Sequence, residues 1–135
     1  MATDDLPIPA EGILLTHFLV TADIARSVAF YRDVLGGTVV RPGEPTMVRL
    51  ANSWIIVNLG GGPTEDKPDV VLTTPPEENR TSAFLNIRVA DIQAVYEDWR
   101  SRGARFLTRP IDRGPEIRCY LRDPDGHLIE VGQSH

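Results

Sequence analysis

Apolar residues recur along the chain at two different spacings, and the same succession of spacings occurs twice. In two stretches the apolar residues lie three or four positions apart, which is the spacing of one face of an α-helix. The first helical stripe consists of Ile24, Val28, Tyr31 and Leu35, and the second of Ile92, Val95 and Trp99. Such self-similarity predicts a duplicated unit with one helix in each copy.

Each predicted helix has a start signal and a stop signal. Asp23 and Asp91 stand directly before the two stripes, and a short side-chain oxygen at that position accepts from the first free backbone N–H groups. Gly36 and Gly103 follow the stripes and provide the left-handed residue that closes a helix. We therefore expect helices that begin after each aspartate and end at each glycine.

Short apolar runs, broken by Pro, Gly, Asn and Asp, follow each helix and are typical of strands. The predicted strands after the helices are 38–41, 46–51, 53–60, 105–110, 116–123 and 127–133, and the apolar run before each helix adds one more. The chain is thus predicted to contain an arm (1–12), a βαβββ module (13–60), a linker (61–81) with a short strand at 70–72, and a second βαβββ module (82–133). The predicted fold class is α+β, with the tandem modules forming a curved half-barrel sheet around a ligand cavity, because each helix covers only one face of its sheet.

Composition excludes several classes of protein. The 135 residues carry a net charge of −5 without any cluster of Lys and Arg, so no nucleic-acid partner is expected. No apolar run approaches the ~20 residues that span a bilayer, and the acidic start MATDDLPIPAEG is unlike a secretory signal. The single Cys119 excludes an intramolecular disulfide. We expect a cytoplasmic protein without a membrane anchor.

Glu130 is the first candidate for chemistry, because it lies between Ile129 and Val131 in a predicted strand. Side chains alternate between the two faces of a strand, so Glu130 is expected to face the cavity with a polar partner. Metal ligation and pairing with Arg88 or Arg118 both remain open. The same alternation places further side chains on the cavity side. The expected cavity residues are Trp54, Asn58, Phe84, Asn86, Arg88, Arg118, Tyr120 and Glu130.

The phrases DIARSVAFYRDVLGG and DPDGHLIEV, together with the paired βαβββ modules, resemble the vicinal oxygen chelate superfamily. This superfamily includes glyoxalase I, extradiol dioxygenases, fosfomycin-resistance thiol transferases and metal-free bleomycin-binding proteins. The resemblance covers residues 13 to 133. It implies the fold but no single reaction, because one fold hosts many chemistries.

In the metal-dependent members of this superfamily, the first and last strands of each module supply the ligands. Carried over, Glu130 matches a ligand position, whereas His17 lies one residue past the expected position at Thr16, so strand alternation would point it the wrong way. Phe84 or Leu85 stands where a second histidine is expected, and Asn58 where a glutamate or glutamine is common. The metal candidates are therefore His17 and Glu130.

The resemblance leaves three functions open. The first, which the missing ligands favour, is metal-free binding and sequestration of a bulky, partly aromatic compound, as in bleomycin resistance, with no cofactor. The second is a glyoxalase- or dioxygenase-type enzyme with one divalent metal (Ni, Fe, Mn or Zn), acting on vicinal oxygens. The third is a metal-free enzyme that uses Arg88, Tyr120 and Glu130. In each case we expect a small-molecule ligand and a homodimer in which two chains line each site.

Overall fold

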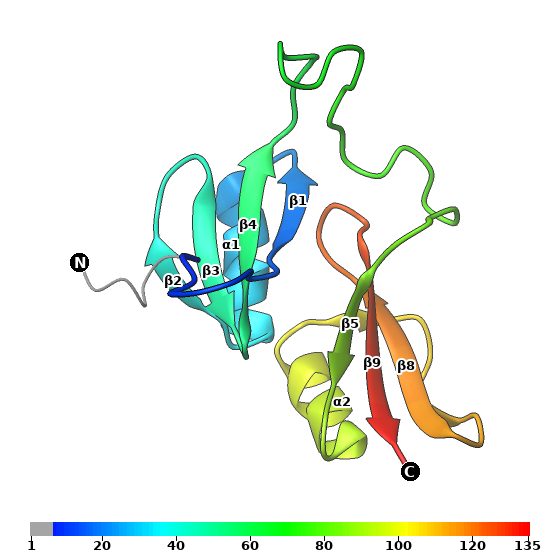
Figure 1. Cartoon of the computed structure of the whole chain (residues 1–135). Helices are drawn as coiled ribbons and strands as arrows, with labels where there is room; N and C mark the ends of the chain where they lie inside the picture. The colour runs from blue at the N-terminus through cyan, green and yellow to red at the C-terminus, as the bar shows by residue number, and fades with distance from the viewer. Residues whose placement is uncertain (1–6) are drawn as a thin grey trace. The chain divides into compact units, whose positions relative to one another are not determined.

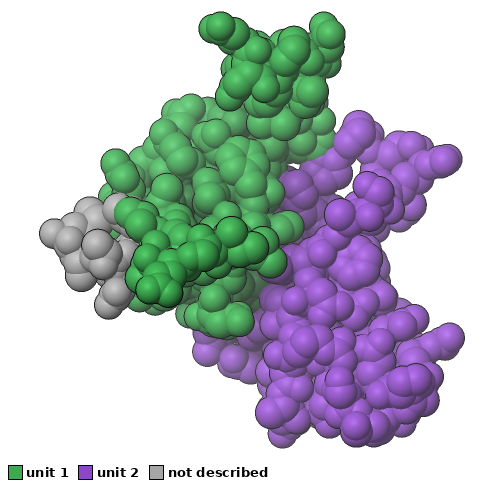
Figure 2. Space-filling model, in the orientation of Figure 1, with its two compact units in different colours: residues 1–74 green, residues 75–135 purple. Residues whose placement is uncertain are grey.

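The protein consists of two compact units in a computed structural model that describes residues 7–135. The first unit is residues 1–74 and the second residues 75–135, coloured separately in Figure 2. The boundary between the units falls inside the stretch 61–81 that the sequence marks as a linker. Half of the predicted arm, residues 1–6, lies outside the described residues, and residues 7–12 contain no helix or strand.

The first unit is a four-stranded sheet with a helix packed against it (Figure 1). Its elements are β1 (His17–Thr21), α1 (Ile24–Ala29), η2 (Phe30–Val34), β2 (Thr38–Arg41), β3 (Thr46–Leu50) and β4 (Ser53–Leu59). The strand order is β1-β4-β3-β2, and β1 runs parallel to β4. The buried residues of the sheet and the helix, among them Val28, Tyr31, Val48, Ile55 and Val57, form the core of the unit.

The second unit repeats this plan (Figure 1). Its elements are β5 (Leu85–Arg88), α2 (Ile92–Ser101), β6 (Arg105–Phe106), β7 (Ile111–Asp112), β8 (Glu116–Arg122) and β9 (Leu128–Ser134). The strand order is β5-β9-β8-β6, β5 runs parallel to β9, and β7 also pairs with β8. The core consists of Ile92, Trp99, Cys119, Leu121, Ile129 and Val131. The α+β fold class and the duplicated βαβββ order are confirmed.

The predicted helix ends are confirmed. The Asp23 side chain accepts from the Arg26 backbone N–H, and the Asp91 side chain accepts from that of Ala94, both at 3.1 Å. Gly36 and Gly103 have φ angles of 84° and 103°, which side chains with a Cβ rarely adopt. The first helix differs from expectation in one respect, because it widens into a π-helix from Phe30 onward.

Four details of the predicted strands are wrong. Of the strand expected at 105–110, only Arg105–Phe106 forms one, because the chain bends at 107–109 and Pro110 has no backbone N–H for a ladder. The apolar run that starts at Ile13 becomes a strand only from His17. The expected strand at 70–72 is a single bridge between Leu72 and Gly61, because the many Gly and Pro residues around it prevent a longer ladder. The short strand β7 was not predicted, since two residues between Pro110 and Gly114 carry no periodicity.

A tight turn fixes the register of β8 against β9. Oδ1 of Asp123 accepts from the backbone N–H groups of Asp125 and His127, each at 2.9 Å. Asp123 is fully buried, so these bonds satisfy an otherwise costly carboxylate. The turn pairs Arg122 with Leu128 and therefore places Tyr120 directly opposite Glu130.

None of the helices in the described part of the chain is both long and apolar enough to cross a membrane.

Candidate functional site

The open face of the second unit's sheet collects the polar side chains that the sequence pattern predicts. Glu130 pairs in register with Asn86 on one side and with Tyr120 on the other. Side chains of paired residues point to the same side of a sheet, so these three residues share one face. Ile129 and Val131 point to the opposite face and are buried. Glu130 thus lies at the centre of a polar row.

Glu130 is buried and fully hydrogen-bonded. Its side chain is only 7% exposed. Oε1 accepts from Nδ2 of Asn86 at 2.8 Å and from Nη1 of Arg88 at 3.5 Å, and Oε2 accepts from the hydroxyl of Tyr120 at 2.6 Å. Buried carboxylates are stable only with such donors. The prediction that Glu130 has polar partners is confirmed, and of the two expected arginines the partner is Arg88.

Arg88 links Glu130 to the far end of the row. Its Nη1 also donates to Oε1 of Glu116 at 2.8 Å, and its Nη2 donates to Oγ of Ser134 at 3.0 Å. Arg118 pairs with the other oxygen of Glu116 at 3.5 Å rather than with Glu130. Two arginines and two glutamates therefore form one connected network across β5, β9 and β8.

Gly132 lets Arg88 cross the sheet. A Cβ on Gly132 would lie 2.6 Å from Cζ of Arg88 and 2.9 Å from Oε1 of Glu116. Both distances are shorter than a non-bonded contact allows, so the guanidinium lies over the strand where no side chain stands. A glycine inside a strand often marks such a close approach. This contact explains a glycine that the strand pattern of 127–133 does not.

The network shifts two pKa values in opposite directions. The hydrogen bond to the Glu130 carboxylate, then burial, then the charge of Glu130 raise the pKa of Tyr120 above its ordinary value. The hydrogen bond from Arg88 and the charges of Arg88 and Arg118 lower the pKa of Glu116. Tyr120 therefore stays a neutral donor toward Glu130 at neutral pH.

An apolar cavity of about 270 Å³ adjoins this row at Tyr120, and we call it the aromatic pocket. It is lined by Glu78, Asn79, Thr81, Phe84, Leu107, Tyr120, Arg122 and Leu128. The rings of Phe84 and Tyr120 meet edge to face with centroids 5.9 Å apart, an arrangement that aromatic pairs prefer. The pocket therefore offers apolar walls next to a hydrogen-bonded tyrosine.

The candidate residues of the first unit have other surroundings. Trp54 and Asn58 share the open face of β4, and the guanidinium of Arg49 stacks 5.4 Å from the Trp54 ring centroid. Oδ1 of Asn58 accepts from the backbone N–H of Leu59. His17 pairs in register with Ile55, so it is on the face of the sheet that carries the buried core.

The donors around Glu130 do not fit a divalent metal. Its two oxygens already accept hydrogen bonds from three N–H or O–H donors, and one of these donors belongs to the cation Arg88. Metal ligands must instead present free lone pairs. No group of three or more His, Cys, Asp and Glu side chains within residues 7–135 could hold a metal ion. The two metal candidates, His17 and Glu130, belong to different units.

The sequence analysis did not assign several residues of this site. Ser134 lies on the same face as Glu130, so strand alternation could have identified it. Leu107 and Arg122 line the aromatic pocket. Leu107 directly follows β6, and its backbone N–H donates to the Tyr120 carbonyl at 2.8 Å. It falls in the strand predicted at 105–110, but nothing in the sequence marks it as a pocket residue.

Comparison with known proteins is consistent with this architecture. Residues 14–131 match the family model described as the Glyoxalase/Bleomycin resistance protein/Dioxygenase superfamily. A lactoylglutathione lyase of Haemophilus influenzae is 30% identical over 87% of this chain and 89% of its own length. The metallothiol transferase FosB of Staphylococcus epidermidis is 24% identical over 82% of this chain and 73% of its own.

A solved structure extends the likeness to the fold. A glyoxalase/bleomycin resistance protein/dioxygenase from Nocardioides superposes with a TM-score of 0.72 at 20% identity, covering 94% of this chain and 87% of its own. The residues that match the family model, 14–131, span the helices and strands of both modules, the two helix caps and the turn that sets Tyr120 opposite Glu130. The chain belongs to the Glyoxalase/Bleomycin resistance protein/Dioxygenase superfamily, the vicinal oxygen chelate proteins.

Proposed function

We propose that this protein binds a bulky, partly aromatic small molecule without a metal and sequesters it. The observation that carries the proposal is the position of Tyr120, whose ring lines the aromatic pocket while its hydroxyl donates to the buried Glu130. A ligand with an aromatic part can pack on Phe84 and Tyr120.

The polar network supports binding rather than metal chemistry. Both oxygens of Glu130 already accept hydrogen bonds, so a metal would have to displace donors that include the Arg88 cation. In our proposal Glu130 holds Tyr120, Asn86 and Arg88 in fixed positions. Asn86, Arg88 and Arg118 donate their remaining N–H groups to the ligand, and the Tyr120 oxygen, whose hydrogen points to Glu130, accepts from it. Preorganised donors of this kind reduce the entropy cost of binding.

A metal-dependent lyase is the second candidate, because the Haemophilus influenzae relative at 30% identity is a lactoylglutathione lyase. In this case Glu130 would be a metal ligand and would exchange the Tyr120 hydrogen bond for a bond to the metal. The third function, a metal-free enzyme with Arg88, Tyr120 and Glu130 as its reactive groups, uses the same network.

Two measurements separate the first two candidates. The neutral probe N-phenyl-1-naphthylamine reports on apolar pockets by fluorescence, and we expect saturable binding that a chelator does not change. Phe84→Ala should weaken it about tenfold, since a lost aromatic contact is worth ~1.4 kcal/mol. Ile111→Ala is the matched control, because Ile111 is an apolar residue of the same unit that does not line the pocket.

Metal analysis of the purified protein, with titration by Ni²⁺, Mn²⁺, Fe²⁺ and Zn²⁺, is the second measurement. We expect no stoichiometric binding. One equivalent of metal that is lost in Glu130→Ala but retained in Glu77→Ala would overturn the proposal in favour of the lyase. Absence of probe binding in the wild-type protein would contradict the proposed role of the aromatic pocket.

A further inference from the structure

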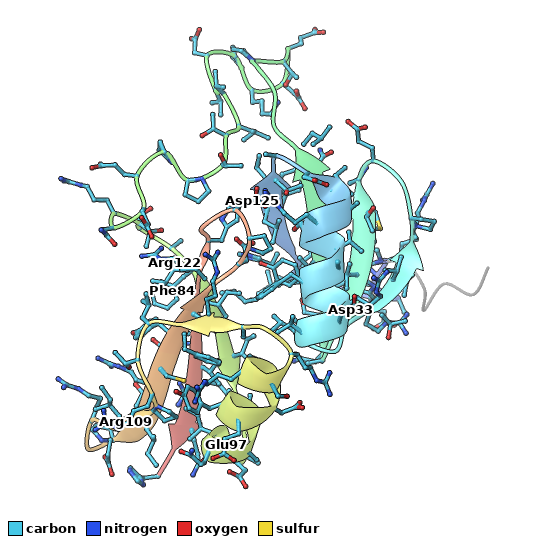
Figure 3. All side chains as sticks on the ribbon, turned by 180° about the vertical axis from the view of Figure 1, so that it is seen from behind. Asp33, Phe84, Glu97, Arg109, Arg122 and Asp125 are labelled. Atoms are coloured by element: carbon cyan, nitrogen blue, oxygen red, sulfur yellow. The ribbon has the colours of Figure 1, made fainter. Side chains whose placement is uncertain are left out.

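A second cavity adjoins the aromatic pocket and has a different character. It measures about 300 Å³, and we call it the charged cavity. It is lined by Pro75, Glu78, Arg105, Arg122, Pro124, Asp125 and Gly126. Glu78 and Arg122 line both cavities. Figure 3 labels Arg122, together with one residue from each cavity: Phe84 from the aromatic pocket and Asp125 from the charged cavity. A single ligand could therefore extend from one cavity into the other past Arg122.

Arg122 is a mostly buried cation whose N–H groups are not all hydrogen-bonded within the part of the chain that the structure describes. Its side chain is 14% exposed, and its Nη1 and Nη2 donate to the Gly126 carbonyl and to Oδ1 of Asn79 at 3.1 and 3.2 Å. Its Nε is buried without a hydrogen-bond partner among the described residues. Buried donors are almost always satisfied, so the unpaired Nε–H next to a cavity points to an acceptor supplied by a ligand.

A second guanidinium lines the same cavity. Arg105 pairs in register with Arg122 on the neighbouring strand, so the two cations share one face of the sheet. Like charges opposite one another on adjacent strands repel, and an anion between them removes that repulsion. A guanidinium also matches the planar fork of a carboxylate or phosphate better than an ammonium does.

Two carboxylates, Glu78 and Asp125, also line the charged cavity. Oε1 of Glu78 lies 3.7 Å from Nε of Arg122, too far for a hydrogen bond, and the Glu78 side chain is 75% exposed. An ion pair of this length whose carboxylate is exposed to water contributes little. Glu78 can therefore leave Arg122 when a better acceptor arrives, at small cost to the fold.

We propose that the charged cavity binds the acidic group of the ligand, and that Arg122, helped by Arg105, is the residue that selects for it. The inference rests on the proposed function, since the aromatic part of the same molecule occupies the aromatic pocket. The ligand class is thus an aromatic acid, in which a carboxylate, sulfonate or phosphate oxyanion displaces the Glu78 carboxylate from Nε of Arg122.

A matched pair of probes tests this selectivity. 8-Anilinonaphthalene-1-sulfonate differs from N-phenyl-1-naphthylamine by one sulfonate group, so the ratio of the two affinities isolates the acidic group. We expect the sulfonate to bind the wild-type protein at least tenfold more tightly than the neutral probe. Arg122→Gln should abolish this preference. Because Arg122 also lines the aromatic pocket, the readout is the ratio of the two affinities and not the affinity of the neutral probe alone.

Other variants test the charged cavity in case Arg122→Gln does not fold. Arg105→Gln, at an exposed position, should weaken the sulfonate about threefold and leave thermal unfolding unchanged. Glu78→Gln should strengthen sulfonate binding severalfold, because it removes the competing carboxylate, whereas Glu77→Gln, the matched neighbour, should not. Displacement of the sulfonate by phenylacetate or by phenyl phosphate then tells which acid the cavity prefers.

The outcomes separate this inference from the proposed function. If both probes bind equally to the wild type and to Arg122→Gln, the charged cavity does not select an acid, although metal-free aromatic binding stands. If neither probe binds, the proposed function fails and the inference fails with it. Weaker sulfonate binding in Glu78→Gln, or equal displacement by the neutral benzyl alcohol, also overturns the assignment.

Discussion

The hydrogen bond from Tyr120 to Glu130 is the contact whose removal has the clearest expected effect. Tyr120→Phe keeps the ring that packs on Phe84 but removes the donor to Oε2, 2.6 Å away. Glu130 keeps Asn86 and Arg88 on Oε1, yet Oε2 stays buried without its donor. Hydrogen bonds to charged groups contribute ~1.5–3 kcal/mol. We therefore expect the free energy of unfolding to fall by about 2 kcal/mol.

Urea denaturation followed by tryptophan fluorescence measures this loss, in a Trp54→Phe background that leaves Trp99 of the same unit as the only fluorescent indole. Tyr96→Phe is the matched control, since Tyr96 lies on α2 with its ring against Phe106 and has no carboxylate partner among the described residues. An unfolding midpoint for Tyr120→Phe equal to that of the control would refute the reasoning. It would mean that water or another donor replaces the hydroxyl at no cost.

The raised pKa of Tyr120 adds a pH dependence with a defined sign. The neutral phenol is favoured in the folded state, so its contribution is fully present below the ordinary pKa of 10.0 and is lost as pH rises through the higher folded value. As pH rises from 10.0 to the higher folded value, the wild type should therefore lose a component of stability that Tyr120→Phe lacks. Glu130→Gln should lower the pKa of Tyr120 in a spectrophotometric titration, because the carboxylate is its main cause.

Four further outcomes are expected. Asp23→Ala and Asp91→Ala should each cost about 1 kcal/mol of stability through loss of a helix cap, and unchanged denaturation midpoints would contradict this. Burial raises the pKa of the Cys119 thiol to about 11, so a disulfide reagent at roughly pH 8 should react only after unfolding; rapid labelling of the native protein would be inconsistent. Gly132→Ala should displace the Arg88 guanidinium from Glu116 and from the buried Glu130 and lower the urea midpoint, and a midpoint equal to that of the wild type would contradict this. Sedimentation should show a homodimer, and a monomer at micromolar concentration with intact probe binding would refute that prediction.

Strand alternation predicted the polar row well, because a period of two is a local property of the chain. It was enough to place Asn86, Tyr120 and Glu130 on one face once the strands were located. The helix caps were equally predictable, since Asp23 and Asp91 bond to backbone groups only three residues away.

The partners within the row could not be predicted, because they depend on contacts between distant residues. The sequence left Glu130 free to pair with Arg88 or Arg118. Both arginines pair in register with Gly132, one from each neighbouring strand, so the side-chain conformations decide: Arg88 reaches Glu130, and Arg118 turns to Glu116. The charged cavity was missed for the same reason. Arg105 and Arg122 lie 17 positions apart in the sequence, and only the pairing of β6 with β8 brings them onto one face.

The turn held by the buried Asp123 carboxylate constrains how this protein can change over evolutionary time. Because the functional side chains on β8 are two positions apart, inserting or deleting one residue in the turn would shift β8 against β9 by one position and set Cys119 or Leu121 opposite Glu130 in place of Tyr120. Such a change would bury charges and expose the core at once. Descendants of this chain can therefore vary their ligand by substituting individual residues along β8, whereas the length of the turn between Arg122 and Leu128 must stay constant.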